Sequence, residues 1–431
     1  MITLHSWQQP LYQRQVDILS NHGVVLNACG TGVGKTYLTV QHLVDLAPAP
    51  VFIICPKTVI SNWRRVLDAF EVPQSRVQGV INWEKLMTGK TQFWDGKGWG
   101  LEVGTIVVVD EVHKGASGPK TITSKMLALL KAYGFKVIML SATIADSPLK
   151  MRACGYHLGL HDYNPASFFK FCRAYGCYPS PFHQGLDFPK GPTGKKHMAR
   201  LHEAMKDKMV RCALADIPGF PECVIEAKLY DLKDEYTDEV NKIYSEMEKK
   251  LRDTNTNPMI EKLRARQRTE LFKVPLLCDL AEDALEEDKS VVLFVCFRET
   301  LFQLVAELTK RGHKVSSIYG QQDVEERDKN VYLFQENVNH VCVATIDAGG
   351  TGLSLHNVKK ERDRIAYLCP HYNSTLFRQA LGRIHRDGGT AVYQEVVLIA
   401  RSIEERVKRA LDSKLHNLDA INGISDGDLE L

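Results

Sequence analysis

The sequence lacks the features that mark secreted, membrane-spanning and disordered chains. No segment has about 18 consecutive apolar residues, the length that a membrane-spanning helix needs. Residues 1–6 carry no basic region followed by an apolar stretch, and no tract of low complexity interrupts the chain. Charge of one sign is also missing, because 55 Lys and Arg against 52 Asp and Glu leave a net charge of +3. We therefore expect neither secretion nor membrane contact, and the charge neither requires nor excludes a polyanionic partner.

Cysteine use excludes a disulfide framework. The eleven cysteines are odd in number, and most lie within apolar runs such as Ile53-Ile54-Cys55. Thiols in that setting are typical of core residues in a reducing compartment. We expect a cytoplasmic protein with reduced cysteines.

Short β-branched runs separated by helix-forming polar segments predict an α/β fold. A chain of 431 residues has room for two or three domains. Two series of strand-like runs occur, and each predicts a lobe with a mostly parallel sheet and helices on both faces. The first series is 24–26, 51–55, 105–109 and 136–140, and the second is 291–295, 314–319, 340–345, 364–368 and 393–399.

The same patterns predict the domain boundaries. Residues 1–230 are expected to form the first lobe, in which the irregular segment 145–225 is an elaboration rich in Pro, Gly and aromatic residues. Residues 231–275 are charged and helix-forming, which predicts a helical linker. Residues 276–431 are expected to form the second lobe.

A glycine-rich loop after the first apolar run predicts a phosphate site. Residues 28–36 read ACGTGVGKT, with Cys29 where the usual pattern begins with glycine. Glycines let backbone N–H groups turn toward phosphates, the lysine reaches the β and γ phosphates, and the threonine hydroxyl can ligate Mg²⁺. The predicted nucleotide-binding residues of this loop are Gly30, Thr31, Gly32, Gly34, Lys35 and Thr36.

Two adjacent carboxylates end the strand-like run 105–109. Asp110 would bind Mg²⁺ through water, and Glu111 would orient or deprotonate the attacking water. Acidic pairs often end strands without any function, but the phosphate loop earlier in the chain argues against that reading here. Loop and carboxylates together predict an enzyme that hydrolyses ATP with Mg²⁺.

Small hydroxyl side chains end the next strand-like run. Residues 140–143 read Leu-Ser-Ala-Thr, and the hydroxyls of Ser141 and Thr143 could connect the phosphate site to the rest of the lobe. Such residues commonly end strands, so only their order and position give them weight.

The second half of the chain adds two motifs. Residues 345–353 read TIDAGGTGL, whose glycines permit close approach of an anionic ligand. Residues 379–386 read QALGRIHR, which places Arg383 and Arg386 on one face of a predicted helix. Such pairs are more often solvated surface, but a phosphate-loop enzyme needs positive charge at the γ phosphate, so we interpret them as arginine fingers.

The ordered set of motifs resembles the superfamily 2 helicases and translocases. The set comprises Gln13, GTGVGKT, ICPKTVISNW, DEVH, SAT, ATIDAGGTGL and QALGRIHR. Within that superfamily, CPKTVISNWRRVL, AGGTGLSL and QALGRIHRDGG are most similar to the Snf2-type branch, as is the segment 208–221. The resemblance covers about residues 11–406 and implies two RecA-like P-loop lobes with an ATP cleft between them.

The resemblance also implies roles for the matched residues. Gln13 would recognise adenine, and Gln379 would support the interface from which Arg383 and Arg386 reach the nucleotide. The residues that would couple hydrolysis to movement are Ser141 and Thr143, and those along the nucleic-acid backbone are Pro56, Lys57, Thr345, Gly349 and Gly350.

Departures from the Snf2 pattern narrow the expected function. SAT replaces the Gly-Thr-Pro more typical of Snf2-type proteins, and strand-separating helicases usually carry SAT. His113 follows DEV rather than DEA, and the large insertions of chromatin remodellers are missing. We expect a minimal prokaryotic or viral ATP-dependent helicase or translocase acting on DNA rather than RNA, in the host cytoplasm if viral. The sequence identifies no protein partner.

Three alternatives stay open. The protein could translocate on duplex without separating strands, or act on RNA. It could also be a non-enzymatic ATP-gated nucleic-acid clamp, although Glu111 and the two arginines argue against that class.

Other clusters have plainer interpretations. Four tryptophans could stack on bases, but core packing is expected for most of Trp63, Trp83, Trp94 and Trp99. Phosphate contact and solvated surface are both open for Arg64, Arg65 and the basic stretch 190–200. A zinc site is a minor alternative, because the spacing of these Cys and His residues matches no common module: Cys154, His157, His161, Cys172, Cys177 and His183.

Overall fold

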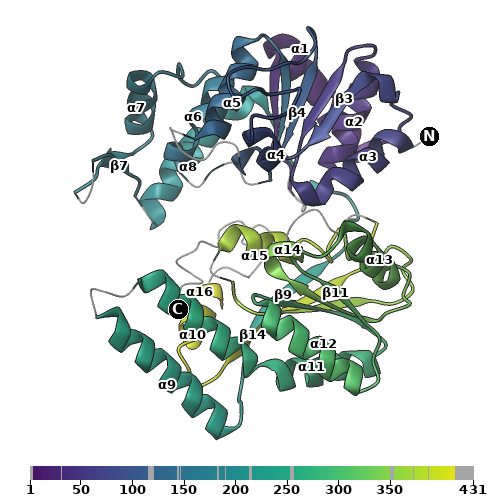
Figure 1. The fold of residues 1–431 in the computed structure, drawn as a ribbon, viewed down its shortest axis with the longest axis vertical. Coiled ribbons are helices and arrows are strands. Elements are labelled where there is room, and N and C mark those ends of the chain that lie inside the picture. The colour runs from purple at the N-terminus through teal and green to yellow at the C-terminus, as the bar shows by residue number, and fades with distance from the viewer. Residues whose placement is uncertain are drawn as a thin grey trace. The chain divides into compact units, whose positions relative to one another are not determined.

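A computed structural model gives the fold (Figure 1), and it divides the chain into two compact units, residues 1–217 and 218–431. The structure describes residues 3–30, 32–114, 121–142, 145, 147–181, 184–189, 191–212, 216–252, 257–349, 354–371, 373–386 and 388–412. Each unit is an α/β domain in its own right.

The first unit alternates strands with helices along most of its length. Its described elements, with η for a 3-10 helix, are η1 (Ser6–Gln8), α1 (Gln9–His22), β1 (Val24–Asn27), α2 (Lys35–Asp45), β2 (Val51–Ile54), η2 (Lys57–Val59), α3 (Ile60–Ala69), η3 (Gln74–Arg76), β3 (Val77–Ile81), α4 (Trp83–Met87), β4 (Ile106–Asp110), η4 (Val112–Lys114), α5 (Ile122–Ala132), β5 (Lys136–Leu140), η5 (Pro148–Lys150), α6 (Arg152–His157), α7 (Pro165–Ala174), β6 (Tyr178–Pro179), β7 (Leu186–Asp187), α8 (Gly191–Met205), η6 (Lys206–Lys208) and β8 (Met209–Val210).

The described strands of this unit form a six-stranded parallel sheet in the order β3-β2-β4-β5-β1-β8. β1 and β4 both pair with β5, so Val24 and Ile106 lie opposite Val137 and Lys136. Parallel strands bury both faces, and the central strands are accordingly apolar along almost their whole length. The carboxyl ends of β1, β4 and β5, where the predicted motifs lie, therefore meet at one edge.

The segment between β5 and β8 leaves this sheet and returns to its edge. It contains α6, α7, the antiparallel β6–β7 ribbon and α8. Asn164 caps α7 by accepting a hydrogen bond from the Ser167 N–H, and Pro165 occupies the first turn. Buried residues of α7 and α8, such as Phe171 and Leu201, join the core of the unit.

The second unit repeats the alternation. Its described elements are β9 (Cys223–Tyr230), α9 (Asp234–Leu251), α10 (Pro258–Leu271), α11 (Val274–Glu286), β10 (Ser290–Val295), α12 (Arg298–Lys310), β11 (Val315–Ile318), α13 (Val324–Gln335), β12 (Val341–Thr345), α14 (Ile346–Gly349), β13 (Arg364–Leu368), α15 (Ser374–Leu381), β14 (Val392–Ile399) and α16 (Glu405–Asp412).

Its described strands form a second six-stranded parallel sheet, ordered β11-β12-β10-β13-β14-β9. Successive residues of β10 belong to two different hydrophobic clusters of the core. Val291 and Leu293 pack with Leu304 of α12, whereas Val292 and Phe294 pack with α13 and α15. Helices thus cover both faces of the sheet, and the predicted fold class of parallel α/β lobes is confirmed.

The first unit ends at Ile217, earlier in the chain than residue 230, the predicted end of the first lobe. β9 pairs with β14 along its whole length, from Cys223 opposite Val392 to Tyr230 opposite Ile399, so it belongs to the second sheet. The helices α9 and α10 also pack on this unit, in a cluster with Ile399. Residues 223–275, expected to end the first lobe and to link the lobes, therefore contribute to the second unit.

None of the helices among the described residues combines the length and apolar character that a membrane crossing needs. The eleven cysteines are all free thiols, and most of them are buried.

Candidate functional site

The phosphate loop joins the end of β1 to the start of α2. Gly32 and Gly34 have φ angles of 96° and 85°, a region that side chains with a Cβ rarely adopt. A Cβ at Gly34 would also lie 2.6 Å from Gln8 Nε2. Glycine is therefore required at Gly34, the N-cap of α2. Thr31 lies outside the described residues.

Gln8 contacts this loop, and sequence reasoning missed it. Its Nε2 donates to the Val33 carbonyl at 2.9 Å, and its Oε1 accepts from the His5 N–H at 3.0 Å. Gln13 is exposed on α1, and its amide donates to Asp17 Oδ1 at 2.9 Å. The structure thus brings Gln8 to the loop and places Gln13 on the surface of the adjoining helix.

The predicted phosphate-binding lysine lies over its own loop. Lys35 Nζ donates to the carbonyl oxygens of Cys29 and Gly30, at 2.9 and 3.0 Å. The end of β8 and the residues after it hydrogen-bond to the loop. The Ala28 and Gly30 N–H groups donate to the carbonyls of Val210 and Cys212. Cys29 is fully buried, and burial raises the pKa of its thiol to about 12. Cysteine in place of the first glycine is therefore accommodated as an inert core residue.

Asp110, at the end of β4, is held by a tryptophan from another element. Trp63 Nε1, on α3, donates to Asp110 Oδ2 at 2.9 Å, and the Glu111 N–H donates to Asp110 Oδ1 at 2.9 Å. Burial, followed by the charge of Glu111, raises the pKa of Asp110 to about 6, whereas the Trp63 bond and the charge of Lys35 lower it. The positive charge of Lys35 thus favours the ionised form of Asp110.

Glu111 stands in an unusual backbone conformation. Its φ is 49°, in the left-handed region that non-glycine residues rarely adopt and that often marks functional sites. His113 Nδ1 lies 3.3 Å from Glu111 Oε2 and 3.0 Å from Ser141 Oγ. A single imidazole nitrogen thus connects the carboxylate to one of the predicted coupling residues. Thr143, the other, lies outside the described residues.

The first unit therefore gathers its predicted motifs at one edge of the sheet. Thr36 is in the first turn of α2, and Asp110 ends β4. Their hydroxyl and carboxylate oxygens are the ligand type that Mg²⁺ prefers, so the residues present fit this ion. Pro56 is buried after β2, and Lys57 is exposed as the first residue of η2.

In the second unit the predicted residues follow β12 and α15. Thr345 is buried at the end of β12, and Gly349 ends α14, whereas Gly350 lies outside the described residues. Gln379, on α15, is 7% exposed. Its side chain is thus largely enclosed.

The placement of Arg383 and Arg386 on one helical face was wrong. α15 ends at Leu381, with Gly382 as its C-cap, so both arginines lie beyond the helix. Glycine is a poor helix residue, and the Arg383 N–H bonds to the carbonyl of Ala380 rather than continuing the helical pattern. Arg383 is 3% exposed. After burial, the charge of Arg386 is the next cause that lowers the pKa of His356, to about 4.

Four tryptophans and the described members of the Cys/His cluster belong to the core. Trp63, Trp83, Trp94 and Trp99 are all 6% exposed or less. His157 Nε2 lies 2.6 Å from the Leu127 carbonyl, and His161 faces the carbonyls of Asp162 and Met151. Among the described residues, which exclude His183, no group of three or more His, Cys, Asp or Glu is arranged to hold a metal ion.

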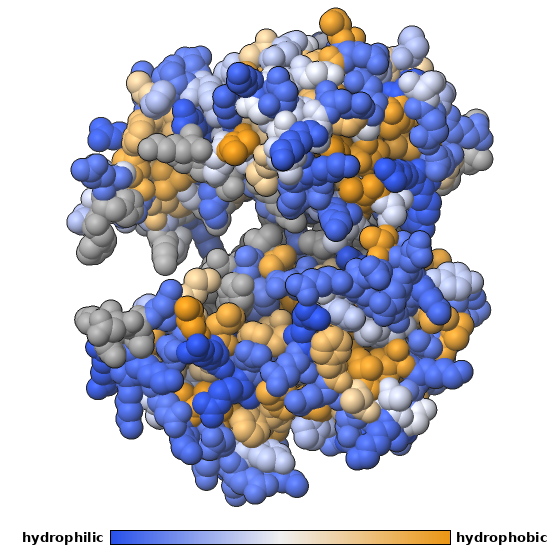
Figure 2. Space-filling view, in the orientation of Figure 1, coloured by the Kyte–Doolittle hydropathy of each residue, from blue (hydrophilic) through white to orange (hydrophobic). Residues whose placement is uncertain are grey.

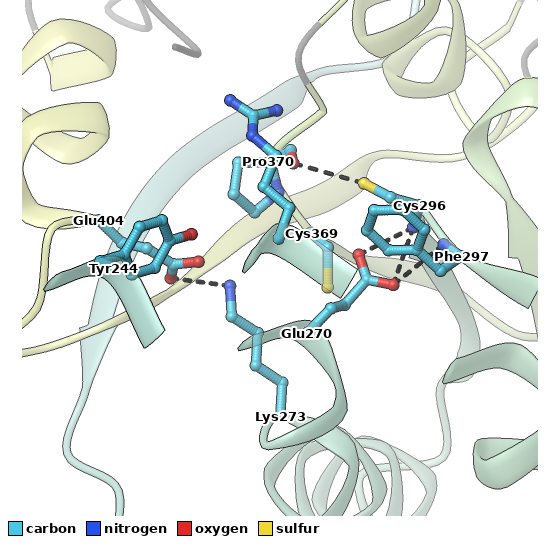
Figure 3. Close-up of a pocket in the computed structure, with 9 residues that line it drawn as sticks. Tyr244, Glu270, Lys273, Cys296, Phe297, Cys369, Pro370 and Glu404 are labelled. Atoms are coloured by element: carbon cyan, nitrogen blue, oxygen red, sulfur yellow. Dashed lines mark hydrogen bonds and ion pairs between the residues drawn. The ribbon is translucent and has the colours of Figure 1, made fainter. Parts of the chain in front are cut away.

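A small pocket in the second unit is lined by charged residues with structural partners (Figure 3). Lys273 Nζ lies 2.8 Å from Glu404 Oε2 and donates to the Val397 carbonyl at 2.9 Å. Burial lowers the pKa of Lys273, but the Glu404 charge and other partners outweigh it, so the pKa is raised overall. Glu270 accepts the N–H groups of Cys296 and Phe297 at the start of α12, where a helix favours negative charge. These contacts connect the end of α10 and the residues after it to the second sheet.

Known proteins are similar to this chain, some over part of the second unit and some over most of its length. Residues 272–388 match the family described as the helicase conserved C-terminal domain. A protein of Acanthamoeba polyphaga mimivirus, named as an ATP-dependent RNA helicase, is 29% identical over 96% of this chain and 82% of its own length. An Arabidopsis thaliana protein, named as a SWI/SNF-related matrix-associated actin-dependent regulator of chromatin, is 31% identical over 36% of this chain and 18% of its own length.

Among solved structures, S. cerevisiae Dbp5 bound to RNA and ADP BeF3 aligns over 96% of this chain and 88% of that chain. The TM-score is 0.53 and the sequence identity is 13%, so the likeness shows the fold alone, two RecA-like lobes. Together with the ordered motifs, these matches support a superfamily 2 helicase with Snf2-like affinity.

Proposed function

We propose that this helicase couples ATP hydrolysis to movement along DNA and to separation of its strands. One observation carries the proposal: the phosphate loop after β1 and Asp110 at the end of β4 lie at the carboxyl ends of two strands of one parallel sheet. Glu111 directly follows that carboxylate and contacts His113, which in turn contacts Ser141. A loop, a metal-binding carboxylate and a general base in one place are what phosphoryl transfer to water requires.

In this proposal each residue has one task. The loop N–H groups and Lys35 bind the phosphates, and Gln13 contacts the adenine. Thr36 and Asp110 would hold Mg²⁺, which neutralises charge on the phosphates when it is bound. Glu111 accepts the proton of the attacking water, and Arg383 and Arg386, supported by Gln379, supply positive charge at the γ phosphate.

Residues of both units would bind the nucleic acid. Pro56 and Lys57 in the first unit, with Thr345, Gly349 and Gly350 in the second, would contact the sugar-phosphate backbone. Contacts of this kind give salt-sensitive binding with little sequence selectivity. Ser141 and Thr143 would transmit the state of the ATP site to the backbone contacts.

RNA is the second candidate substrate, because the relative that matches almost the whole chain is named as an RNA helicase. DNA is preferred on the Snf2-type segments and on the partial match to a chromatin regulator. A strand-displacement panel of DNA forks, duplexes with either overhang and their RNA equivalents decides between the two. Unwinding of RNA only would reverse the substrate assignment.

The motor itself is tested by the ATPase rate with and without polynucleotides. We expect single- or double-stranded nucleic acid to raise the rate severalfold. No stimulation by any DNA or RNA would contradict a motor and leave an ATP-gated clamp.

A further inference from the structure

One short segment accounts for the net positive charge of this chain. Residues 165–200 contain six Lys or Arg and one Asp, a net charge of +5. The whole chain has 55 Lys and Arg against 52 Asp and Glu, so the remainder has 49 against 51, a net charge of −2. The segment comprises α7, β6, β7 and the first two-thirds of α8, within the excursion between β5 and β8. None of these residues belongs to the ATP site.

The five cations of this segment that the structure describes point to solvent. On α7, Phe168 and Phe171 are buried, and Lys170 and Arg173 are exposed on the opposite face. On α8, Leu201 and Met205 are buried, whereas Lys195, Lys196 and Arg200 are exposed. Among the described residues, none of these five cations has a carboxylate partner, whereas Lys206, the residue after α8, pairs with Glu203.

The two helices pack against each other, so their cations lie in one part of the first unit. His197 of α8 packs against Gly176, where φ is 90° and an added Cβ would lie 2.3 Å from the imidazole. The guanidinium of Arg200 lies over the ring of Tyr175, 5.9 Å from its centre. Glycine at Gly176 is therefore needed for close packing of α8 on the turn after α7.

Two aromatic side chains accompany the cations. Phe169, next to Lys170 on α7, is 47% exposed, and Tyr178 on β6 is 46% exposed. Hydrophilic residues surround an apolar area where α7 and β7 are drawn (Figure 2). Exposed rings beside unpaired cations are the combination that holds single-stranded nucleic acid, whose phosphates take the charge and whose unpaired bases stack. A duplex satisfies only the cations, because its bases are already stacked.

We propose that α7, β6 and α8 form an accessory surface that binds single-stranded nucleic acid outside the motor site. The proposal rests on the proposed function for its choice of nucleic acid as the partner. The cations supply most of the affinity, and Phe169 and Tyr178 supply the preference for single strands.

The charge is tested with the triple variant Lys195→Gln, Lys196→Gln and Arg200→Gln in the full chain. Binding of labelled oligothymidine is measured by fluorescence anisotropy over a range of NaCl concentrations. Each phosphate contact to a single strand contributes about 0.7 to the slope of log K against log salt, so the slope should fall by about 2. Affinity at low salt should fall roughly tenfold or more.

A matched control removes the same charge elsewhere in the first unit. Lys85, Lys90 and Lys97 are exposed and lie outside this segment, so changing all three to Gln should leave the slope near the wild-type value. Equal melting temperatures for both variants show that the fold is intact. A triple variant with the slope of the wild type, or a control with the same loss, overturns the proposal.

The aromatic pair is tested by changing Phe169 and Tyr178 together to Ala. Single-strand affinity should fall roughly tenfold or more, with duplex affinity unchanged. An equal loss for duplex overturns the single-strand assignment. A wild-type protein that binds no nucleic acid at any salt concentration contradicts the proposed function as well, whereas wild-type binding that neither variant alters contradicts this inference alone.

Discussion

Trp63 and Asp110 are joined by a hydrogen bond that connects two motifs of the first unit. The indole Nε1 donates to Asp110 Oδ2 at 2.9 Å, from a side chain with no exposed surface. Trp63 belongs to α3, which follows η2 and its exposed Lys57. A displacement of α3 by nucleic acid at Lys57 would thus reach the carboxylate proposed to hold Mg²⁺. Trp63 is a positioning residue in this view and does not touch the nucleotide.

Replacing Trp63 with Phe should weaken the response to Mg²⁺. The ring is retained, but a hydrogen bond to a charged group is lost, which costs about 1.5–3 kcal/mol. The Mg²⁺ concentration for half-maximal ATPase activity should rise roughly tenfold, and the rate at saturating Mg²⁺ should fall less. Calorimetry of nucleotide binding with and without Mg²⁺ gives a readout that is independent of turnover.

Trp99 provides the matched control. Its Nε1 donates to the Met126 carbonyl at 2.9 Å, and the side chain is also buried in the first unit. Trp99→Phe also loses a buried indole hydrogen bond, to a backbone carbonyl and away from the ATP site, so only its stability should fall. Identical Mg²⁺ curves for the two variants would remove the positioning role.

Glu111→Gln should separate ATP binding from hydrolysis. Glutamine keeps the size of the side chain but cannot accept the proton of the attacking water, and general-base catalysis contributes about 10²- to 10⁴-fold. Turnover should fall by that factor, and binding of a fluorescent ATP analogue should change little. Glu102→Gln, at an exposed carboxylate of the same unit, should leave both unchanged. Loss of nucleotide binding in Glu111→Gln would assign Glu111 to the binding site instead.

The sequence predicted the fold because strand-like runs and their connections repeat along the chain. It could not assign the segment 223–230 to a sheet, because an edge strand carries no local sign of its partner, and β9 pairs with a strand far along the chain. The end of α15 was missed for a local reason. Helical spacing suggested that the helix continues, whereas Gly382 ends it.

At the site, sequence order identified the residues next to each motif but not their contacts across the fold. Trp63 is 47 residues from Asp110, and Gln8 is 25 residues from Val33. Neither spacing is a periodicity of helix or strand, so only tertiary packing brings these groups together. The proximity of His113 to Ser141 has the same origin, since β4 and β5 are adjacent in the sheet.

Lys273→Met should strongly destabilise the second unit. Lys273 and Glu404 have 1% and 4% of their side chains exposed, and removing the lysine leaves a buried carboxylate without its cation. Breaking a buried ion pair from one side costs about 3–5 kcal/mol of unfolding free energy. Urea denaturation of the full chain measures the loss.

The partner substitution distinguishes charge from packing. Glu404 also accepts the Ile399 N–H at 2.8 Å, and Gln can keep that bond without a charge. The double variant Lys273→Met with Glu404→Gln should therefore recover most of the loss. Lys359→Met, which breaks the partly exposed pair with Glu336, should cost far less than Lys273→Met. A double variant as unstable as Lys273→Met would assign the effect to packing.

His157 should make the protein less stable in mild acid. Burial lowers its pKa from 6.5 to about 4, although the Leu127 carbonyl and its hydrogen bond oppose the shift. Between these pH values the unfolded chain binds a proton at His157 and the folded chain does not, so stability falls as pH falls from 6.5 toward 4. The slope from this group approaches about 1.4 kcal/mol per pH unit, or about 3 kcal/mol over the window.

His157→Gln keeps a donor for the Leu127 carbonyl and does not titrate, so its free energy of unfolding should depend less on pH by that amount. His22→Gln, at an exposed position on α1, should follow the wild-type curve. The wild type and His157→Gln differ in one titrating group only. A His157→Gln curve as steep as that of the wild type would therefore show that another group causes the acid sensitivity.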